Sequence, residues 1–152
     1  MANFEVGQYN FNKDLITGEA GEEEVKEFFE KSGFKFIGKC SNNELDLIME
    51  YNRKPVTIEV KTDSYRDTGN MAIEIESRGK LSGLSVTTAD YFTTIFRCTN
   101  ELWIIRTEDL RTLISQNNFY LKENGGDKGS NTKFYLIPKS KFRKHFKVYK
   151  LS

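Results

Sequence analysis

Apolar positions repeat along this chain at two different intervals, and they predict a mixture of helices and strands. Apolar side chains recur at helical spacing among glutamates from Thr17 to Ser32, and Gly33 suits a left-handed helix cap. An irregular arm over residues 1–16 precedes this helix. Strand-like segments follow at Phe34–Gly38, Glu44–Tyr51 and Val56–Thr62. A polar turn joins the last two segments, so they are expected to form an antiparallel hairpin.

The later part of the chain mixes both periods. The predicted elements are a strand at Met71–Ser77, a helix at Thr87–Phe96 capped by Thr87 or Thr88, a strand at Glu101–Arg106, a helix at Glu108–Ser115, a flexible loop at Asn124–Asn131, a strand at Lys133–Ile137 and a short helix from Pro138. No repeat or linker divides the chain. We therefore expect a single α/β domain over residues 17–152, a sandwich with a mixed central β-sheet flanked by helices.

Composition narrows the class of protein. The chain has 152 residues, of which 30% are charged and 13% aromatic, which is typical of a single folded domain. It has no apolar run near the ~18 residues of a membrane span and no signal-peptide pattern, so an intracellular, cytoplasmic protein without a membrane partner is expected. Cys40 and Cys98 lack metal-site spacing and His145 is the only histidine, which excludes the usual zinc sites.

The net charge of +1 hides an uneven distribution. Seven Lys and Arg residues and no carboxylates lie between Lys133 and Lys150, whereas residues 19–30 are strongly acidic. The basic segment has two interpretations: a patch that binds a nucleic-acid backbone, or an amphipathic tail whose aromatic residues dock on the core. We favour the docked tail.

The segment Thr57–Lys61 carries the most informative chemistry. Side chains alternate along a strand, so Ile58 and Val60 face one side while Glu59 and Lys61 face the other. On the neighbouring hairpin strand, Asp46 points away from its apolar neighbours, and strand pairing brings it near Glu59. Two adjacent carboxylates repel each other unless a cation or a proton lies between them, and Mg²⁺ favours such oxygen ligands. A lone Glu-x-Lys on a strand is by itself an ordinary surface ion pair.

A third carboxylate strengthens the functional interpretation. Glu22 shares a helix face with Val25 and Phe29, where an unpaired carboxylate is costly. Taken alone, Glu22 is better explained by a hydrated first turn. In combination with Asp46, Glu59 and Lys61, it points to a metal-dependent site.

These residues resemble the PD-(D/E)XK nuclease superfamily, and especially archaeal Holliday-junction resolvases and small phage and bacterial endonucleases. The resemblance rests on Gly21-Glu22, Gly33-Phe34, Asn43–Ile48 and Ile58–Lys61, and it covers residues 18–62 well. It implies a restriction-endonuclease-like fold in which Asp46, Glu59 and the Val60 carbonyl bind Mg²⁺, for which Mn²⁺ substitutes. Glu22 would assist metal or water placement, and Lys61 would position the attacking water. Leu45 stands in place of the Pro that gives the family its name, but that Pro is not a ligand.

The resemblance implies a metal-dependent DNA endonuclease, acting on duplex or branched DNA as a homodimer and encoded by a phage or a cell. Structure-specific cutting of the Holliday-junction type is one option. A non-catalytic DNA-binding module, an RNA nuclease and a plain structural domain are the alternatives. Candidate nucleic-acid contacts are Arg66, Arg78, Lys80, Thr87 and Thr88, in a loop expected to lead into a helix N-terminus. A polar surface loop is an equally good interpretation of this region.

Overall fold

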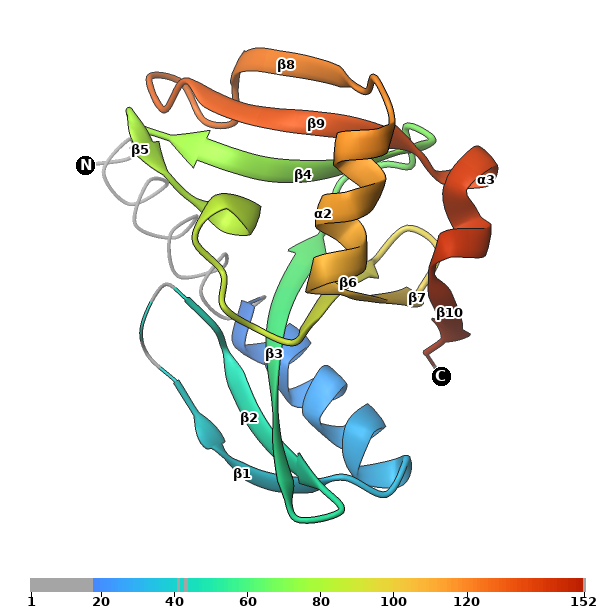
Figure 1. Ribbon diagram of the computed structural model, residues 1–152. Helices are drawn as coiled ribbons and strands as arrows, with labels where there is room; N and C mark the ends of the chain where they lie inside the picture. Colours follow the sequence, from blue (N-terminus) through green and yellow to red (C-terminus); the bar gives the residue numbers. More distant parts are fainter. Residues whose placement is uncertain (1–17, 41, 43, 152) are drawn as a thin grey trace, which may run out of the picture.

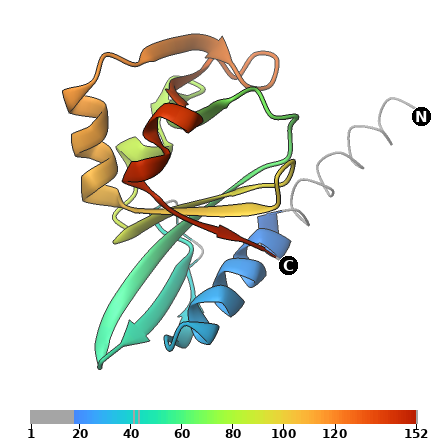
Figure 2. The ribbon, with the colours of Figure 1, turned by 90° about the vertical axis from the view of Figure 1, so that its right-hand side faces the viewer.

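The computed structural model describes residues 18–40, 42 and 44–151. The arm predicted over residues 1–16 and the helix start predicted at Thr17 lie outside this range. Ten strands of the described residues form two β-sheets, and a first helix, described over residues 18–31, packs on the larger sheet (Figure 1). Figure 2 shows the first helix on one side of the larger sheet and the smaller sheet on the other.

The larger sheet has six strands in the order β1-β2-β3-β6-β7-β10. Its strands are β1 (Lys35–Lys39), β2 (Leu47–Tyr51), β3 (Lys54–Asp63), β6 (Tyr91–Phe96), β7 (Glu101–Arg106) and β10 (Lys147–Lys150). The predicted hairpin is confirmed, because β2 and β3 pair antiparallel with Leu47 opposite Ile58. Only β3 and β6 run parallel among the described pairs of this sheet, so the sheet is mixed, as expected for an α/β fold.

The smaller sheet is built from two separate segments of the chain, one between β3 and β6 and one that follows β7. Its order is β5-β4-β9-β8, with β4 (Asn70–Ser77), β5 (Lys80–Leu81), β8 (Tyr120–Gly125) and β9 (Thr132–Pro138). The sequence pattern predicts β4 and β9 but not β5 or β8, and it does not predict a second sheet. One face of the larger sheet is therefore covered mainly by β-structure, where flanking helices were expected.

The helix predicted at Thr87–Phe96 is wrong. Residues 83–85 form a short 3-10 turn, η1 (Gly83–Ser85), and Tyr91–Phe96 is the strand β6. Apolar residues of β6 point to both faces, because Phe92 and Phe96 pack on the smaller sheet while Ile95 packs on the first helix. A strand buried on both faces loses its alternating pattern, so its apolar run can be mistaken for a helix.

Two apolar cores lie on opposite faces of the larger sheet. Val25 and Phe29 of the first helix pack against Leu47, Met49 and Ile58, which are almost fully buried. The second core fills the space between the two sheets and is closed by α2 (Thr107–Gln116). The strand predicted at Glu101–Arg106 and the helix predicted at Glu108–Ser115 are confirmed as β7 and α2.

The basic C-terminal segment is docked on the fold, as we favoured from the sequence. It forms α3 (Lys139–Phe142), the 3-10 turn η2 (Arg143–His145) and β10, and it buries Phe142 and Phe146 in the core. Lys139 is also buried, with its Nζ 3.0 Å from Asp67 Oδ1 and 4.2 Å from the centre of the Phe96 ring. Within the described residues, no helix is long and apolar enough to cross a membrane.

Candidate active site

Strand β3 presents Glu59 on the face of the sheet that lies away from the first helix. Ile58 is fully buried beneath that helix, and the next side chain along the strand, Glu59, pairs in register with Phe92 of the second core. The alternation predicted for β3 is therefore confirmed. Only 4% of the Glu59 surface is exposed, which is unusual for a carboxylate and requires a partner.

Asp46 provides that partner. It lies immediately before β2, where its backbone N–H donates to the Ile58 carbonyl at 3.0 Å. Its Oδ2 accepts a hydrogen bond of 2.7 Å from the Val60 N–H, which fixes the carboxyl group at the edge of β3. Asp46 and Glu59 are also joined by a side-chain hydrogen bond. The structure thus brings together the two carboxyl groups that the sequence placed on adjacent strands.

The pair requires a positive charge between its members. The pKa of Glu59 is raised to about 8, first by burial and then by its hydrogen bond to Asp46. The Lys61 ammonium and a hydrogen bond with Thr87 act in the opposite direction. Near neutral pH Glu59 therefore keeps its proton, and a bound cation would replace that proton.

Glu22 lies at the periphery of this pair. Burial raises the pKa of Glu22, and the Asp46 charge raises it further, while Lys39 lowers it. Glu22 thus senses Asp46 across the junction between the helix and the sheet. Across residues 18–40, 42 and 44–151, however, no three His, Cys, Asp or Glu side chains converge closely enough to hold a metal ion. Glu22 is close enough to Asp46 to be affected by its charge, and its role as a metal ligand stays a prediction.

The donor set at Asp46 and Glu59 nevertheless fits a hard divalent cation. Two carboxylates suit Mg²⁺, which usually keeps several waters and binds one or two protein carboxylates together with phosphate oxygens. The Val60 carbonyl lies on the same edge of β3 as its N–H, which already faces Asp46. Asp46, Glu59 and the Val60 carbonyl are therefore the groups that would hold the ion.

Thr87 lies against Glu59 and is buried. It is 2% exposed, and its hydroxyl donates to the Glu44 carbonyl at 2.7 Å. The Thr88 N–H donates to the same carbonyl at 2.9 Å. Thr87 is thus buried where an exposed contact was expected, and its role in binding nucleic acid stays a prediction. The sequence offered no sign of this burial, because the segment was expected to be an exposed helix cap.

Arg111 holds this loop in place and was missed from the sequence. Its guanidinium, on α2, donates to the carbonyls of Leu84 and Thr87 at 2.9 and 2.7 Å. These bonds tie the loop over Glu59 to a helix distant in the sequence. No local pattern could identify Arg111, because its partners are main-chain oxygens more than twenty residues away.

The other predicted nucleic-acid contacts lie on exposed turns. Arg66 is in the loop between β3 and β4, Arg78 is in the turn between β4 and β5, and Lys80 begins β5. Thr88 is exposed beside the Glu59 loop. The helix N-terminus expected to assist them is absent, because residues 83–85 form only a 3-10 turn and a strand follows. Their role in binding nucleic acid stays a prediction.

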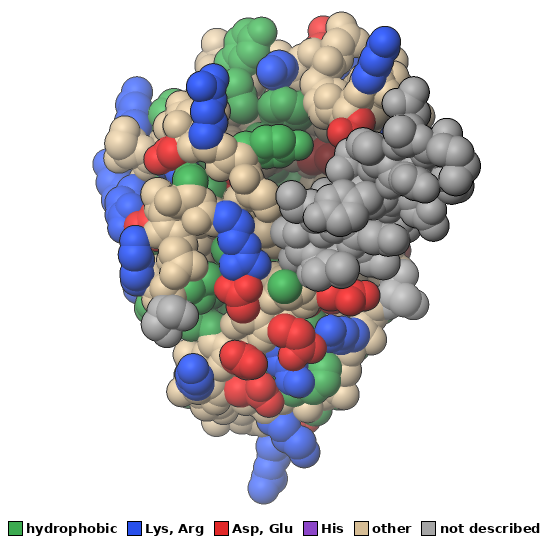
Figure 3. Space-filling view, turned by 180° about the vertical axis from the view of Figure 1, so that it is seen from behind, with side chains coloured by type: hydrophobic (Ala, Val, Ile, Leu, Met, Phe, Trp, Pro, Cys, Tyr) green, Lys and Arg blue, Asp and Glu red, His purple; other side chains and the backbone are tan. Residues whose placement is uncertain are grey.

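Acidic side chains gather on one surface of the molecule (Figure 3). Seen from behind, carboxylates cluster over the first helix (Figure 3), where Glu19, Glu23, Glu27 and Glu30 are exposed. Lys39 pairs with Glu23 at 3.0 Å, which neutralises only part of this surface. A polyanion would be repelled from this face.

Comparison with protein-family models, with curated proteins and with solved structures finds no match to this chain.

Proposed function

We propose that this protein is a metal-dependent endonuclease that hydrolyses phosphodiester bonds in DNA, with a restriction-endonuclease-like arrangement of its first helix and β1–β3. The observation that carries the proposal is the hydrogen-bonded Asp46–Glu59 pair, in which Glu59 is buried on β3 beside Lys61 and the half-buried Asp46 is held by the Val60 N–H. A purely structural site has little use for such a pair, because a buried carboxylate destabilises the fold unless a proton or a cation neutralises it.

Each residue of the site has a distinct task in this proposal. Asp46 and Glu59 hold the cation, and the Val60 N–H keeps Asp46 oriented. The bound cation would neutralise charge on the scissile phosphate and acidify a water molecule. Lys61 positions that water and stabilises the negative charge that develops on the phosphate. Glu22, at the periphery, orders the surrounding water.

The test is cleavage of supercoiled plasmid and of a synthetic four-way junction in Mg²⁺, Mn²⁺ or EDTA. We expect Asp46→Asn to reduce metal-dependent cutting by roughly a hundredfold or more, because it removes a ligand charge from a preorganised site. Glu50→Gln is the matched control, since it removes a carboxylate from the adjacent strand β2 at a position away from the pair. Equal cutting by wild type and Asp46→Asn would refute the assignment of the site.

Two further measurements distinguish the alternatives. Calorimetry with Mg²⁺ separates a catalyst from a non-catalytic DNA-binding module, because a module without a cation site gives no heat that depends on Asp46. Matched DNA and RNA strands of one sequence show which nucleic acid is cut. Sedimentation of the protein with and without DNA tests the proposed homodimer.

A further inference from the structure

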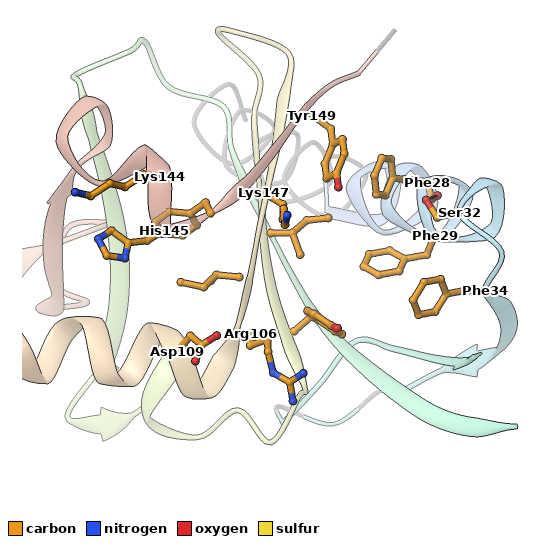
Figure 4. Close-up of a pocket in the computed structure, with 14 residues that line it drawn as sticks. Phe28, Phe29, Ser32, Phe34, Arg106, Asp109, Lys144, His145, Lys147 and Tyr149 are labelled. Carbon is orange, nitrogen blue, oxygen red and sulfur yellow. Dashed lines mark hydrogen bonds between the residues drawn. The ribbon is translucent and has the colours of Figure 1, made fainter. Parts of the chain in front are cut away.

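A groove lies beside β10, the strand at one edge of the larger sheet. This groove of about 480 Å³ runs between the first helix, the end of β7, the start of α2 and the segment from η2 to β10 (Figure 4). Its volume is within the range of small-ligand sites, about 300–1,000 Å³. None of Glu22, Asp46, Glu59 and Lys61 lines it. The groove is therefore separate from the candidate active site.

One half of the groove is a wall of aromatic rings. Phe28 and Tyr149 lie with their ring centres 4.7 Å apart, and Phe34 and Tyr91 extend the wall around the almost fully buried Phe29. Tyr149 is 41% exposed, although it lies on a strand within a sheet. Figure 4 shows the phenylalanines of the first helix and Tyr149 together at one end of the groove. These rings meet at angles of 49° to 87°, and it is the exposed ring of Tyr149 that favours stacking with another ring.

The other half is basic. Arg106, Lys144 and Lys147 are exposed and, among the described residues, form no ion pair. His145 lies beside them, and of the carboxylates in the described part of the chain only Asp109 lines the groove. The Arg106 guanidinium lies 5.8 Å from the centre of the Tyr91 ring, so the basic and aromatic halves meet there. The groove therefore attracts a ligand that joins a flat ring to an anion.

We infer that this groove binds an unpaired nucleotide, with its base against the aromatic wall and its phosphate toward the basic half. Aromatic stacking combined with a positively charged groove is how proteins bind single-stranded nucleic acid. The bases of a duplex are stacked inside it and cannot reach the wall, so the ligand is single-stranded. This inference rests on the groove alone and holds whether or not the chain cleaves DNA.

The groove and the carboxylate pair are connected by one row of paired residues that runs across the strands of the larger sheet. Glu59 pairs with Phe92, and Phe92 pairs with Ile105, which lines the groove. The main chains at the two sites are thus two strand spacings apart, roughly 10 Å. Phe92 is buried between them, so the groove is not a continuation of the carboxylate site.

The test is fluorescence anisotropy with a labelled short oligothymidylate, in EDTA so that cleavage plays no part. We expect wild type to bind it more tightly than a blunt duplex of the same length, and to lose affinity as salt is raised. Tyr149→Leu should weaken binding about tenfold, because it removes one stacking ring but keeps an apolar side chain. Lys147→Gln should weaken binding and reduce its salt dependence.

Lys128→Gln is the control, because it removes an exposed charge from the loop after β8, which does not line the groove. Urea unfolding of every variant confirms that each one folds. Competition with thymidine monophosphate and with inorganic phosphate shows whether a free nucleotide is enough to displace the labelled oligonucleotide. Displacement of the oligonucleotide by inorganic phosphate at the same concentration as the nucleotide would overturn the role of the rings. Equal affinity for duplex, or equal loss with Lys128→Gln, would overturn the inference. A dimer that dissociates on Tyr149→Leu, without oligonucleotide binding, would also overturn it, since the groove would then be a subunit interface.

Discussion

Replacement of Glu59 by Gln should stabilise this protein at alkaline pH and leave its stability nearly unchanged at acid pH. An unfolded glutamate loses its proton near pH 4.5, whereas burial and Asp46 raise the pKa of Glu59 to about 8 in the folded chain. Between these two values the folded state binds more protons than the unfolded state. The free energy of unfolding therefore falls as pH rises through this window.

The size of the effect follows from the two pKa values. The difference between 4.5 and about 8 corresponds to a loss of up to about 5 kcal/mol, which is complete above pH 8. Domains of this kind are stable by only about 5–15 kcal/mol, so the loss is a large fraction of the total. A glutamine side chain at this position carries no charge at any pH, and its amide can still donate to Asp46. The stabilisation by Glu59→Gln should therefore grow from near zero at pH 4.5 to several kcal/mol at pH 8.

Urea unfolding of wild type and Glu59→Gln at half-unit intervals from pH 4.5 to pH 9, in EDTA, measures this difference. Subtracting the two curves cancels every pH dependence that both proteins share. Glu50→Gln, on the neighbouring strand, should show no such pH dependence. Addition of Mg²⁺ at pH 8 should stabilise wild type but not Glu59→Gln, because a cation replaces the missing proton. A difference in the free energy of unfolding that stays constant with pH, or that shrinks as pH rises, would refute the raised pKa of Glu59 in the folded chain.

Two other substitutions test how the site is supported. Gly21→Ala should destabilise the fold by about 1–3 kcal/mol, because the new Cβ would collide with the Thr62 hydroxyl of β3. Thermal unfolding measures this loss. The double variant Gly21→Ala with Thr62→Ala should recover most of the lost stability. Arg111→Gln should cost about 1–3 kcal/mol and lower the cutting rate, because the loop that carries Thr87 loses two charge-assisted hydrogen bonds. Unchanged proteolysis of that loop in Arg111→Gln would show that the guanidinium does not hold it.

The β3 face and its partner could be predicted from sequence because the information is local. Side chains alternate along Thr57–Lys61, so Glu59 lies on the other face of the strand from Ile58. The short turn before β3 sets the register that brings Asp46 to the Val60 N–H. Both follow from the geometry of a single hairpin. The first helix was likewise predictable from its apolar face.

The cover over the site was not predictable, because it depends on distant partners. The Thr87 hydroxyl donates to the Glu44 carbonyl, and the Arg111 guanidinium donates to the Thr87 carbonyl; neither contact can be read from the local sequence pattern. β6 was taken for a helix because both of its faces are buried. The short, partly exposed β8 and β5 have no clear period, so the second sheet they complete was missed as well.

The separation of the smaller sheet into two segments constrains the order in which a newly synthesised chain can fold. β4 and β5 are made before β6, but β4 can pair with β9 only after residues 132–138 have emerged from the ribosome. The β2–β3 hairpin, which carries Glu59 and which Asp46 immediately precedes, can form much earlier, before the helix that carries Arg111 has been synthesised. β10, the last strand to be made, borders the basic and aromatic groove. The carboxylate pair can therefore form before the segments that cover it, whereas the groove beside Tyr149 also needs β10, which follows the other described strands in the chain.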